Sequence, residues 1–412
     1  MAELYLGIDL GTSGARAVVT DAAGHLVSTG KSAHADHPGS PRVPSVWWAA
    51  TEQAVLAALE DVDARDVRAM AVDGTSGTML AIDAMGVPLS DGVMYNDVCT
   101  DAELLDRITA ASPETTAARG ATSGLARAVQ LLTHKPARVV HQADWIARQF
   151  SGRWISDENN ALKTGYDPVS GSWPDWIAEV IDPAVLPEVV APGTVVGQVG
   201  DNLFGLSPDC AVVAGTTDGC ASFLATGAAQ AGDGVTALGS TLTIKLLSDQ
   251  PVFAPQFGIY SHKILGLWLA GGASNTGGNA LLSVFSAPEI AALSTRIDPE
   301  TDTGLFYYPL AKPGERFPIS DPEHAPVMGP RPAADSTHLQ AMFEGIADIE
   351  AQAYARLAEL GAPDLRSVRS VGGGSANAAW TRIRARRLSV AMPEPLSGEA
   401  AFGTALLARS AL

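Results

Sequence analysis

The sequence predicts an α/β fold that contains two similar halves. Residues 4–22 have the pattern of a buried strand, a turn rich in Gly, Thr and Ser, and a second strand. The same pattern begins again at residues 235–249. The chain has 412 residues, which is enough for two domains of ordinary size. The restart therefore indicates a duplicated fold, with a boundary expected near residues 225–235.

The other elements follow from the spacing of apolar residues and from turn residues. Pro44 and Ser45 open a stretch with helical spacing, which predicts a helix at residues 44–60. Residues 101–150 are expected to be largely helical, because Gly152 is the kind of residue at which helices end. Strands are expected, in chain order, at residues 4–9, 15–22, 26–33, 67–75, 78–86, 210–219 and 366–374. Further helices are expected at residues 337–360, 375–388 and 399–412.

Composition and charge exclude several classes of protein. Hydrophobic residues make up 46% of the chain and charged residues 17%, a balance typical of a compact globular protein rather than a disordered one. The net charge is 27 − 45 = −18, and no stripe of Lys and Arg interrupts it. Such a chain repels nucleic acid and anionic lipid, so we expect neither as a partner. An anionic ligand would have to be held by backbone N–H groups, helix N-termini or a metal ion.

The three cysteines indicate a reducing compartment. Cys99, Cys210 and Cys220 form no CxxC pair and have no metal-ligand spacing. The first residues carry no basic region of a signal peptide, and no segment approaches the ~20 apolar residues of a membrane span. We therefore expect a cytoplasmic protein.

Four turns after apolar strands carry the residues that point to chemistry. They are residues 9–14, 73–77, 215–219 and 239–241. Glycine lets backbone N–H groups approach an oxygen closely, and Thr and Ser hydroxyls add donors, so these turns are expected to bind phosphate. Three of them also contain a carboxylate, namely Asp9, Asp73 and Asp218. A carboxylate beside phosphate suggests Mg²⁺ and a general base.

A fifth turn, residues 372–377, lies between an expected strand and an expected helix. It is either a tight crossover, common in α/β proteins, or a place where the backbone packs against a flat ligand such as adenine or ribose. Trp380 follows one helical turn later. Its indole would either stack on the base or belong to the core.

These motifs, in this order, resemble those of the FGGY carbohydrate kinases of the actin/Hsp70 superfamily. LGIDLGTSGARAV resembles their first phosphate loop, GTTDG the loop with the catalytic Asp, GST the second phosphate loop, and GGGSAN the adenosine loop. GERFPISDP is a weakened form of their second-half signature. DGTSGT, NALKTGY, YSHK and AAFGTA are most similar to the subgroup assigned as D-ribulose kinases, also called xylulose-kinase-like.

The resemblance implies two actin-like (ribonuclease H-like) domains with a cleft between them. The N-terminal domain, residues 1–228, would carry the sugar and the catalytic base and would be completed by the C-terminal helix 399–412. The second domain, residues 229–398, would bind the nucleotide. The implied partners are a small sugar and ATP with Mg²⁺, and the implied assembly is a monomer or a homodimer.

The resemblance also assigns roles to residues. Asp218 would be the general base, and Asp9 would hold Mg²⁺, through water. The phosphates would lie against Thr12, Ser13, Gly239, Ser240 and Thr241. The adenosine would lie against Gly373, Gly374, Asn377 and Trp380. The sugar would contact Asp73, Ser76, Asn96 and Asp218, with Asp97 and Lys163 as weaker candidates, and Asp73 could equally cap its own turn.

Two departures from the family pattern concern the sugar. Many members have Gln-Met-His after the second turn, where this chain has Thr78-Met79-Leu80. Many have Trp-x-Asp-x-Arg downstream, where residues 95–99 lack the Arg. By its subgroup likeness we expect D-ribulose, converted to D-ribulose 5-phosphate. The alternatives are another pentulose or a polyol, such as xylulose or ribitol, an actin-like ATPase, and a non-catalytic sugar sensor.

Overall fold

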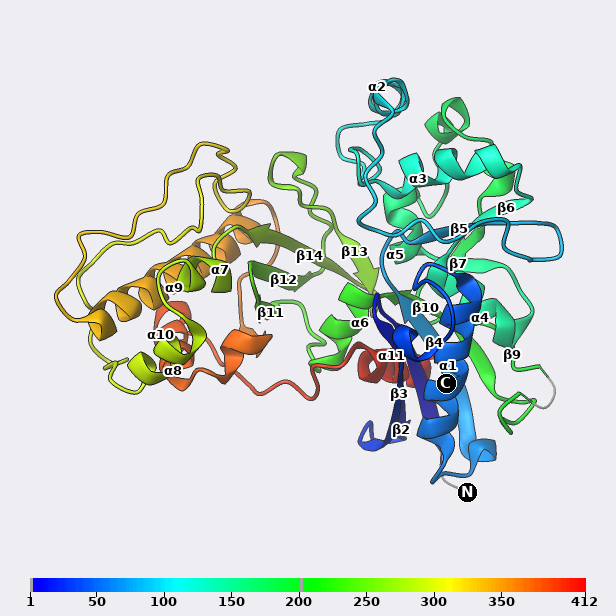
Figure 1. Ribbon diagram of the computed structural model, residues 1–412, viewed down its shortest axis with the longest axis horizontal. Helices are drawn as coiled ribbons and strands as arrows, with labels where there is room; N and C mark the ends of the chain where they lie inside the picture. The colour runs from blue at the N-terminus through cyan, green and yellow to red at the C-terminus, as the bar shows by residue number, and fades with distance from the viewer. Residues whose placement is uncertain (1–2, 201–202) are drawn as a thin grey trace. The chain divides into compact units, whose positions relative to one another are not determined.

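The computed structural model describes residues 3–200 and 203–412, which form two compact units (Figure 1). The first unit runs to Gly227 and also includes residues 262–265 and 397–412. The second consists of residues 228–261 and 266–396. No sequence pattern indicated that residues 262–265 belong to the first unit.

The first unit is built on a six-stranded sheet of order β3-β2-β1-β4-β10-β9. β1, β2 and β3 form an antiparallel meander, β1, β4 and β10 are parallel to one another, and β9 is antiparallel to β10. The strands are β1 (Leu4–Leu10), β2 (Gly14–Asp21), β3 (Leu26–Ala33), β4 (Val67–Gly74), β9 (Val195–Gln198) and β10 (Ala211–Thr217). All seven residues of β1 are buried, as expected for a strand with a helical layer on each face.

The two faces of this sheet are covered by different helices. Leu6 and Ile8 of β1 share a core with α1 (Pro44–Leu59) and α4 (Gln142–Ser151). The opposite face packs on α11 (Ala400–Arg409), which in turn contacts α6 (Asp218–Ala225). Gly7 permits this packing, because a Cβ there would lie 2.1 Å from the carbonyl oxygen of Ala401. The C-terminal helix is therefore an integral part of the first unit (Figure 1).

A second layer of the first unit surrounds two small sheets. β5 (Met79–Ile82) pairs antiparallel with β6 (Arg138–His141), and β7 (Ile155–Asp157) pairs parallel with β8 (Glu188–Val190). The helices here are α2 (Ala102–Ala111), α3 (Gly124–Leu131) and α5 (Glu158–Ala161). β6 interrupts the stretch expected to be helical, because Val139 and Val140 are β-branched and become buried by pairing with β5.

The second unit repeats the strand order of the first. β14, β12, β11 and β15 are neighbours, with β11 antiparallel to β12 and parallel to β15. The bounds are β11 (Asp233–Leu238), β12 (Leu242–Ser248), β14 (Leu267–Ser274) and β15 (Ser367–Val371). The short β13 (His262–Ile264) lies in the segment that belongs to the first unit. The antiparallel pair β11–β12 and the parallel strand β15 correspond to β1, β2 and β4, as a duplicated fold predicts.

One long helix closes the core of the second unit. α9 (Asp335–Glu359) buries an apolar face that includes Phe343 and Ile346. α10 (Ala378–Leu388) packs beside it, and the shorter α7 (Gly278–Leu282) and α8 (Ala287–Ser294) complete the unit. Cys99, Cys210 and Cys220 are buried and form no disulfide. Among the described residues, no helix combines the length and apolar character that crossing a membrane would require.

Candidate active site

Carboxylates gather at the carboxyl ends of the parallel strands of the first unit. Asp9 on β1 lies opposite Arg16 on β2 and opposite Asp73 on β4. Asp218 is the first residue of α6 and directly follows β10. Because the carboxyl ends of neighbouring parallel strands meet at one edge of a sheet, the three aspartates lie together.

Asp9 and Asp73 form a buried pair of like groups. Asp9 is 5% exposed and Asp73 is 0% exposed. Burial raises the pKa of Asp9, and the charge of Asp218 adds to the rise. Burial, followed by the charge of Asp9, raises the pKa of Asp73 well above its usual range. Two carboxylates this close do not both ionise, so Asp73 is the protonated partner and donates a hydrogen bond to the Asp9 carboxylate.

Thr404 on α11 holds the other side of Asp73. Its hydroxyl donates to Oδ2 of Asp73. Oδ1 of Asp73 has no N–H or hydroxyl donor among the described residues. Its remaining interaction is the hydrogen bond between the Asp73 and Asp9 carboxyl groups. Asp73 thus neither reaches the surface nor caps its own turn. The structure corrects both interpretations of Asp73, because a side chain held between Thr404 and Asp9 is not available to a sugar or to the turn.

Asp218 is more accessible than the other two aspartates. Its side chain is half-buried, and its Oδ1 accepts a hydrogen bond of 2.7 Å from the backbone N–H of Gly219. It stands in the first turn of α6, where the helix dipole favours an anion. A half-buried carboxylate at this position is of the type that can accept a proton from a substrate hydroxyl.

The β1–β2 turn presents its hydroxyls to solvent. Thr12 and Ser13 are exposed, while the turn backbone is held by hydrogen bonds from Gly11 N to Gly14 O (3.0 Å) and from His34 N to Ser13 O (2.9 Å). An ordered backbone with free hydroxyls suits an oxyanion ligand.

Two loops of the first unit carry the residues expected at the sugar. Ser76 follows β4, and its Oγ is buried without a hydrogen-bond partner in the described part of the chain. Asn96 is exposed in the loop after β5. Thr78 ties the two loops together, since its Oγ1 accepts a hydrogen bond of 3.1 Å from Tyr95 N. Lys163 lies partly exposed in a short turn after α5.

The turn of the second unit that is expected to bind phosphate is also exposed. Gly239 and Ser240 stand at the β11–β12 turn, with Thr241 half-buried beside them. The turn is supported by the start of α7, where Gly278 N donates to the carbonyl of Gly239 at 2.9 Å. Gly277 packs so closely that a Cβ would lie 2.9 Å from the carbonyl carbon of Thr241.

The turn between β15 and α10 exposes Gly373 and leaves Gly374 half-buried. Asn377 caps α10, because its side-chain oxygen accepts from Trp380 N at 3.0 Å. Its amide nitrogen donates to Ser294 Oγ on α8 at 2.8 Å. Both polar atoms of Asn377 are thus engaged in fixing the turn.

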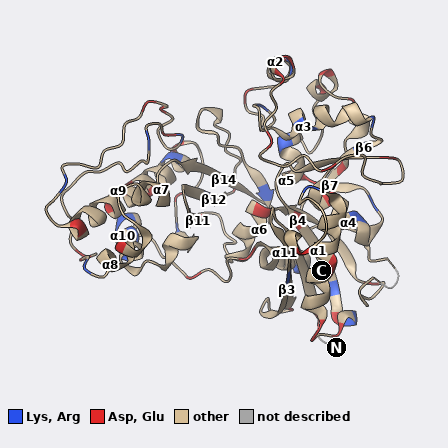
Figure 2. Ribbon diagram, in the orientation of Figure 1, with Lys and Arg blue, Asp and Glu red and all other residues tan. Residues whose placement is uncertain are grey.

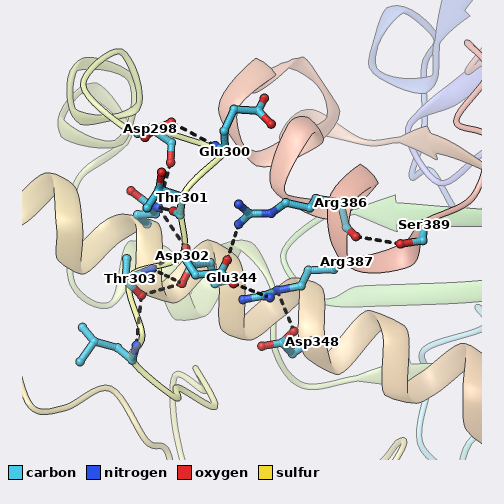
Figure 3. Close-up of polar contacts among 12 residues, drawn as sticks. Asp298, Glu300, Thr301, Asp302, Thr303, Glu344, Asp348, Arg386, Arg387 and Ser389 are labelled. Atoms are coloured by element: carbon cyan, nitrogen blue, oxygen red, sulfur yellow. Dashed lines mark hydrogen bonds and ion pairs between the residues drawn. The ribbon is translucent and has the colours of Figure 1, made fainter.

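Charged residues hold the adjoining loop of the second unit, residues 298–303, against α9 and α10 (Figure 3). Asp302 accepts from Arg386 and Arg387, and Arg387 also contacts Asp348 at 3.0 Å. Thr303 donates to Glu344 at 2.6 Å. The loop is anchored to α10, the helix that Asn377 caps.

Over the whole chain, Lys and Arg are scattered over both units and interleaved with Asp and Glu (Figure 2).

Two family models match the chain from end to end. The model of the FGGY family of carbohydrate kinases, N-terminal domain, matches residues 4–225, and the C-terminal domain model matches residues 227–412. The chain belongs to the FGGY family of carbohydrate kinases. It is a sugar kinase, and ATP is the phosphoryl donor that this family implies.

Individual relatives agree with this assignment. A xylulose kinase of Streptomyces coelicolor is 28% identical over 417 residues, covering 95% of this chain and 84% of the relative. The crystal structure of a xyloylose kinase from Brucella ovis has a TM-score of 0.83 at 24% identity and covers 98% of this chain and 90% of that one. The xylulose kinase of Bifidobacterium adolescentis has a TM-score of 0.82 at 21% identity, covering 99% of this chain and 92% of that one. These likenesses confirm the predicted two-domain actin-like fold.

The structure corrects one further assignment in this kinase. Trp380 was expected at the adenine, but it is 2% exposed and stacks on Phe343 of α9, with ring centroids 5.0 Å apart and planes 7° from parallel. Trp380 is a core residue. Its place follows from the apolar face of α9, which needs a large partner, and a single Trp near a Gly-rich turn does not reveal that choice.

Three residues of the candidate site had no role in the sequence interpretation. Arg16 places a guanidinium 3.4 Å from Asp9 Oδ2, beside the β1–β2 turn. The cross-strand position of Arg16 opposite Asp9 was the available signal. Arg42 binds Asp97 at 2.5 and 2.7 Å, and this pairing lowers the pKa of Asp97. Thr404 is 331 positions from Asp73 in the sequence, and no local sequence pattern predicts a contact between them.

Proposed function

We propose that this kinase transfers the γ-phosphoryl group of ATP to the terminal hydroxyl of a small ketose, with D-ribulose as the preferred acceptor and D-ribulose 5-phosphate as the product. The observation that supports the proposal most strongly is the trio of Asp9, Asp73 and Asp218 at the carboxyl ends of β1, β4 and β10. In that trio Asp218 is half-buried, and burial raises the pKa of Asp73 well above its usual range.

In the proposed reaction Asp218 accepts the proton of the sugar hydroxyl. The sugar oxygen forms a bond to the γ-phosphorus, the bond from that phosphorus to the bridging oxygen breaks, and ADP leaves. Asp73 keeps its own proton on the buried side and so leaves Asp9 anionic. Arg16, beside Asp9 and mostly exposed, would contribute positive charge at the phosphate turn.

Asp9 fits a divalent cation. It is a buried carboxylate whose pKa burial raises and which faces the charge of Asp218, so a cation there relieves both penalties. No group of three His, Cys, Asp or Glu side chains among the described residues could hold a metal unaided. Water and phosphate oxygens would supply the other ligands, as is usual for Mg²⁺. When bound, Mg²⁺ neutralises charge on the phosphates.

The remaining predicted residues complete the proposal. Thr12 and Ser13 in the first unit, with Gly239, Ser240 and Thr241 in the second, would bind phosphate. Gly373, Gly374 and the capped turn at Asn377 would support the adenosine. Ser76 and Asn96 would contact the sugar. ATP and three cysteines outside any disulfide are typical of the cytoplasm, which we propose as the location.

D-xylulose is the second candidate acceptor, favoured by the names of the relatives. D-ribulose and D-xylulose differ only in configuration at C3, so discrimination depends on the hydroxyl contacts at that carbon. Met79 and Leu80 are 0% exposed in β5 and offer no polar group where many family members have Met and His. The subgroup likeness around DGTSGT supports D-ribulose.

The test measures ADP release with D-ribulose, D-xylulose, ribitol and glycerol as acceptors, each with Mg²⁺ and with EDTA. We expect kcat/KM to be highest for D-ribulose and activity to vanish in EDTA. A higher kcat/KM for D-xylulose would overturn the acceptor. ATP turnover that is equally fast without any acceptor would favour an ATPase, and binding of a sugar without turnover would favour a sensor.

A further inference from the structure

One buried arginine of the first unit binds backbone rather than a carboxylate. Arg127 lies on α3 and is 1% exposed. Its guanidinium donates to the carbonyls of Gly77 (2.8 Å), Tyr95 (2.9 Å) and Thr122 (2.8 and 2.9 Å), with a longer contact of 3.4 Å to the carbonyl of Asp97. Burial lowers its pKa, and the nearby charge of Asp97 acts in the opposite sense.

The carbonyls that Arg127 binds belong to the two loops expected at the sugar. Gly77 directly follows Ser76, and Tyr95 and Asp97 flank Asn96. Burying a guanidinium is costly, and an apolar side chain would fill the same space more cheaply. What an apolar side chain cannot do is donate several hydrogen bonds in one plane to two separate loops. The bound geometry of Arg127 therefore fixes the loops relative to each other.

The same contacts determine where the loop amides point. In a trans peptide the C=O and the N–H point in opposite directions. With the Tyr95 carbonyl held on Arg127, the N–H of Asn96 is turned away from the buried guanidinium. Gly77 has φ = +87°, a conformation that brings its carbonyl to Arg127 without strain, and a Cβ there would lie 3.0 Å from Arg127 Nη2.

The hydroxyl of Ser76 supports a ligand at this place. Its Oγ is buried and has no hydrogen-bond partner in the described part of the chain. The neighbouring hydroxyls are already paired, since Thr75 Oγ1 lies 2.6 Å from Thr78 Oγ1 and 2.8 Å from Gln142 Oε1. An unsatisfied hydroxyl beside two paired ones is suited to a hydroxyl of the acceptor.

We propose that Arg127 is a positioning residue for the acceptor sugar: it holds the loops of Ser76 and Asn96 so that a polyhydroxylated acceptor is bound by one hydroxyl and by loop amides. This rests on the proposed function, because it takes these loops as the sugar side of the kinase. Arg127 itself touches no substrate and acts through the backbone.

Arg119 offers a matched control in the same unit. It also binds backbone carbonyls, donating to Thr109 O at 3.0 Å and to Ser112 O, and its Nε donates to Ser112 Oγ at 3.1 Å. These residues lie at the end of α2, away from Ser76 and Asn96 in the sequence and in the hydrogen-bond network. Arg119→Met removes a similar anchor without touching the sugar loops.

The experiment measures KM for the acceptor, KM for ATP, kcat and hydrogen exchange in Arg127→Met, Arg127→Lys and Arg119→Met. In Arg127→Met we expect the acceptor KM to rise about 10- to 100-fold, with the ATP KM within about twofold, because loop displacements near 1 Å have effects of this size. Amides of residues 76–78 and 95–98 should exchange faster. Arg127→Lys, a point charge with three donors, should recover only part of the acceptor KM.

Arg119→Met should leave both KM values unchanged. If Arg127→Met fails to fold, Arg127→Lys carries the same test with the same readouts. An acceptor KM that is unchanged in the folded variants, or an equal rise in both KM values, would overturn the proposal. If the wild-type kinase accepts no pentulose but phosphorylates another alcohol, the proposed function fails, and the Arg127 prediction is then judged on that acceptor.

Discussion

The second unit buries a pair of opposite charges, whereas the first buries two carboxyl groups side by side. Glu350 on α9 and Arg384 on α10 are both 0% exposed and form two hydrogen bonds of 2.6 and 2.7 Å. Thr236 on β11 donates to the same Glu350, and Arg384 also donates to Ser370 on β15. This network joins two helices to two strands.

In the first unit Asp9 and Asp73 lie opposite each other, and burial followed by the charge of Asp9 raises the pKa of Asp73. The neighbouring cation, Arg16, is 3.4 Å from Asp9 and mostly exposed. Opposite charges that satisfy each other hold elements together, and changing one of them should cost stability. Like charges oppose folding, so they persist where chemistry requires them. The two regions should therefore respond to substitution in different ways.

The largest effect is expected from the accessible carboxylate of the first unit. Asp218→Asn keeps the shape of the side chain but removes the proton acceptor, so kcat should fall by about 10²- to 10⁴-fold. The free energy of unfolding and the KM for ATP should change little. Steady-state kinetics with D-ribulose and a thermal melt would check this, and near-normal turnover would remove Asp218 from the role of base.

The opposite pattern is expected in the second unit. Glu350→Gln leaves the guanidinium of Arg384 buried without its counter-charge, so the free energy of unfolding should fall by about 3–5 kcal/mol. The folded fraction should retain kcat within a few-fold. Urea denaturation measures the loss. The control is Glu359→Gln on the same helix, which breaks an exposed pair with Arg356 and should cost less than about 1 kcal/mol.

Asp157, another buried carboxylate of the first unit, allows the comparison to be tested by the pH dependence of stability. Asp157 is 3% exposed and caps α5, accepting from Asn159 N and Asn160 N, yet burial raises its pKa to about 7. The folded pKa lies above the unfolded value of 3.8, so folding carries no penalty below pH 4 and an increasing one as the pH rises to 7. Asp157→Asn lacks this penalty.

The stability of the wild-type protein relative to Asp157→Asn should therefore decline between pH 4 and pH 7, by on the order of 4 kcal/mol. Urea melts of both proteins at each pH would measure the difference. Asp157→Ser also removes the charge but keeps a capping oxygen, so it should show the same slope with a different offset. A difference that stays constant with pH would show that Asp157 is charged in the folded protein below pH 7.

The contrast also explains what the sequence could predict. The strands around Asp9 and Asp218 follow from apolar runs beside Gly-rich turns, which are local signals, and these turns led to the family. The partner of Asp73 could not be predicted, because Thr404 reaches it only after α11 packs on the sheet across Gly7. Trp380 was misplaced for a related reason, since its burial depends on α9.

Arginines show the same limit. Many family members have an arginine two positions after the Asp of this loop, and this chain does not. Arg42 and Arg127 nevertheless place guanidinium groups at Asp97, from 55 and 30 positions away in the sequence. A motif search reads one stretch of chain and does not detect a group supplied from another. The long-range residues of the site are for this reason the ones that sequence interpretation missed.

The smallest effect is expected at the contact that links α11 to the like-charged pair. Thr404→Val keeps the shape and removes the hydroxyl that donates to Asp73 Oδ2. A buried oxygen without its donor costs about 1–3 kcal/mol. Because Asp73 is already protonated, that carboxyl can turn and reduce the loss, so we expect a value near the lower end. The proton on Asp73 should then be held less rigidly against Asp9, and kcat should fall by about tenfold or less, with the KM for ATP unchanged.

Thr404→Ser, which keeps the hydroxyl, is the control and should retain nearly full kcat. Thermal melts and steady-state kinetics of the two variants separate packing from hydrogen bonding. If Thr404→Ser loses as much activity as Thr404→Val, the methyl group rather than the hydroxyl is what the pair requires, and α11 contributes only packing to the site.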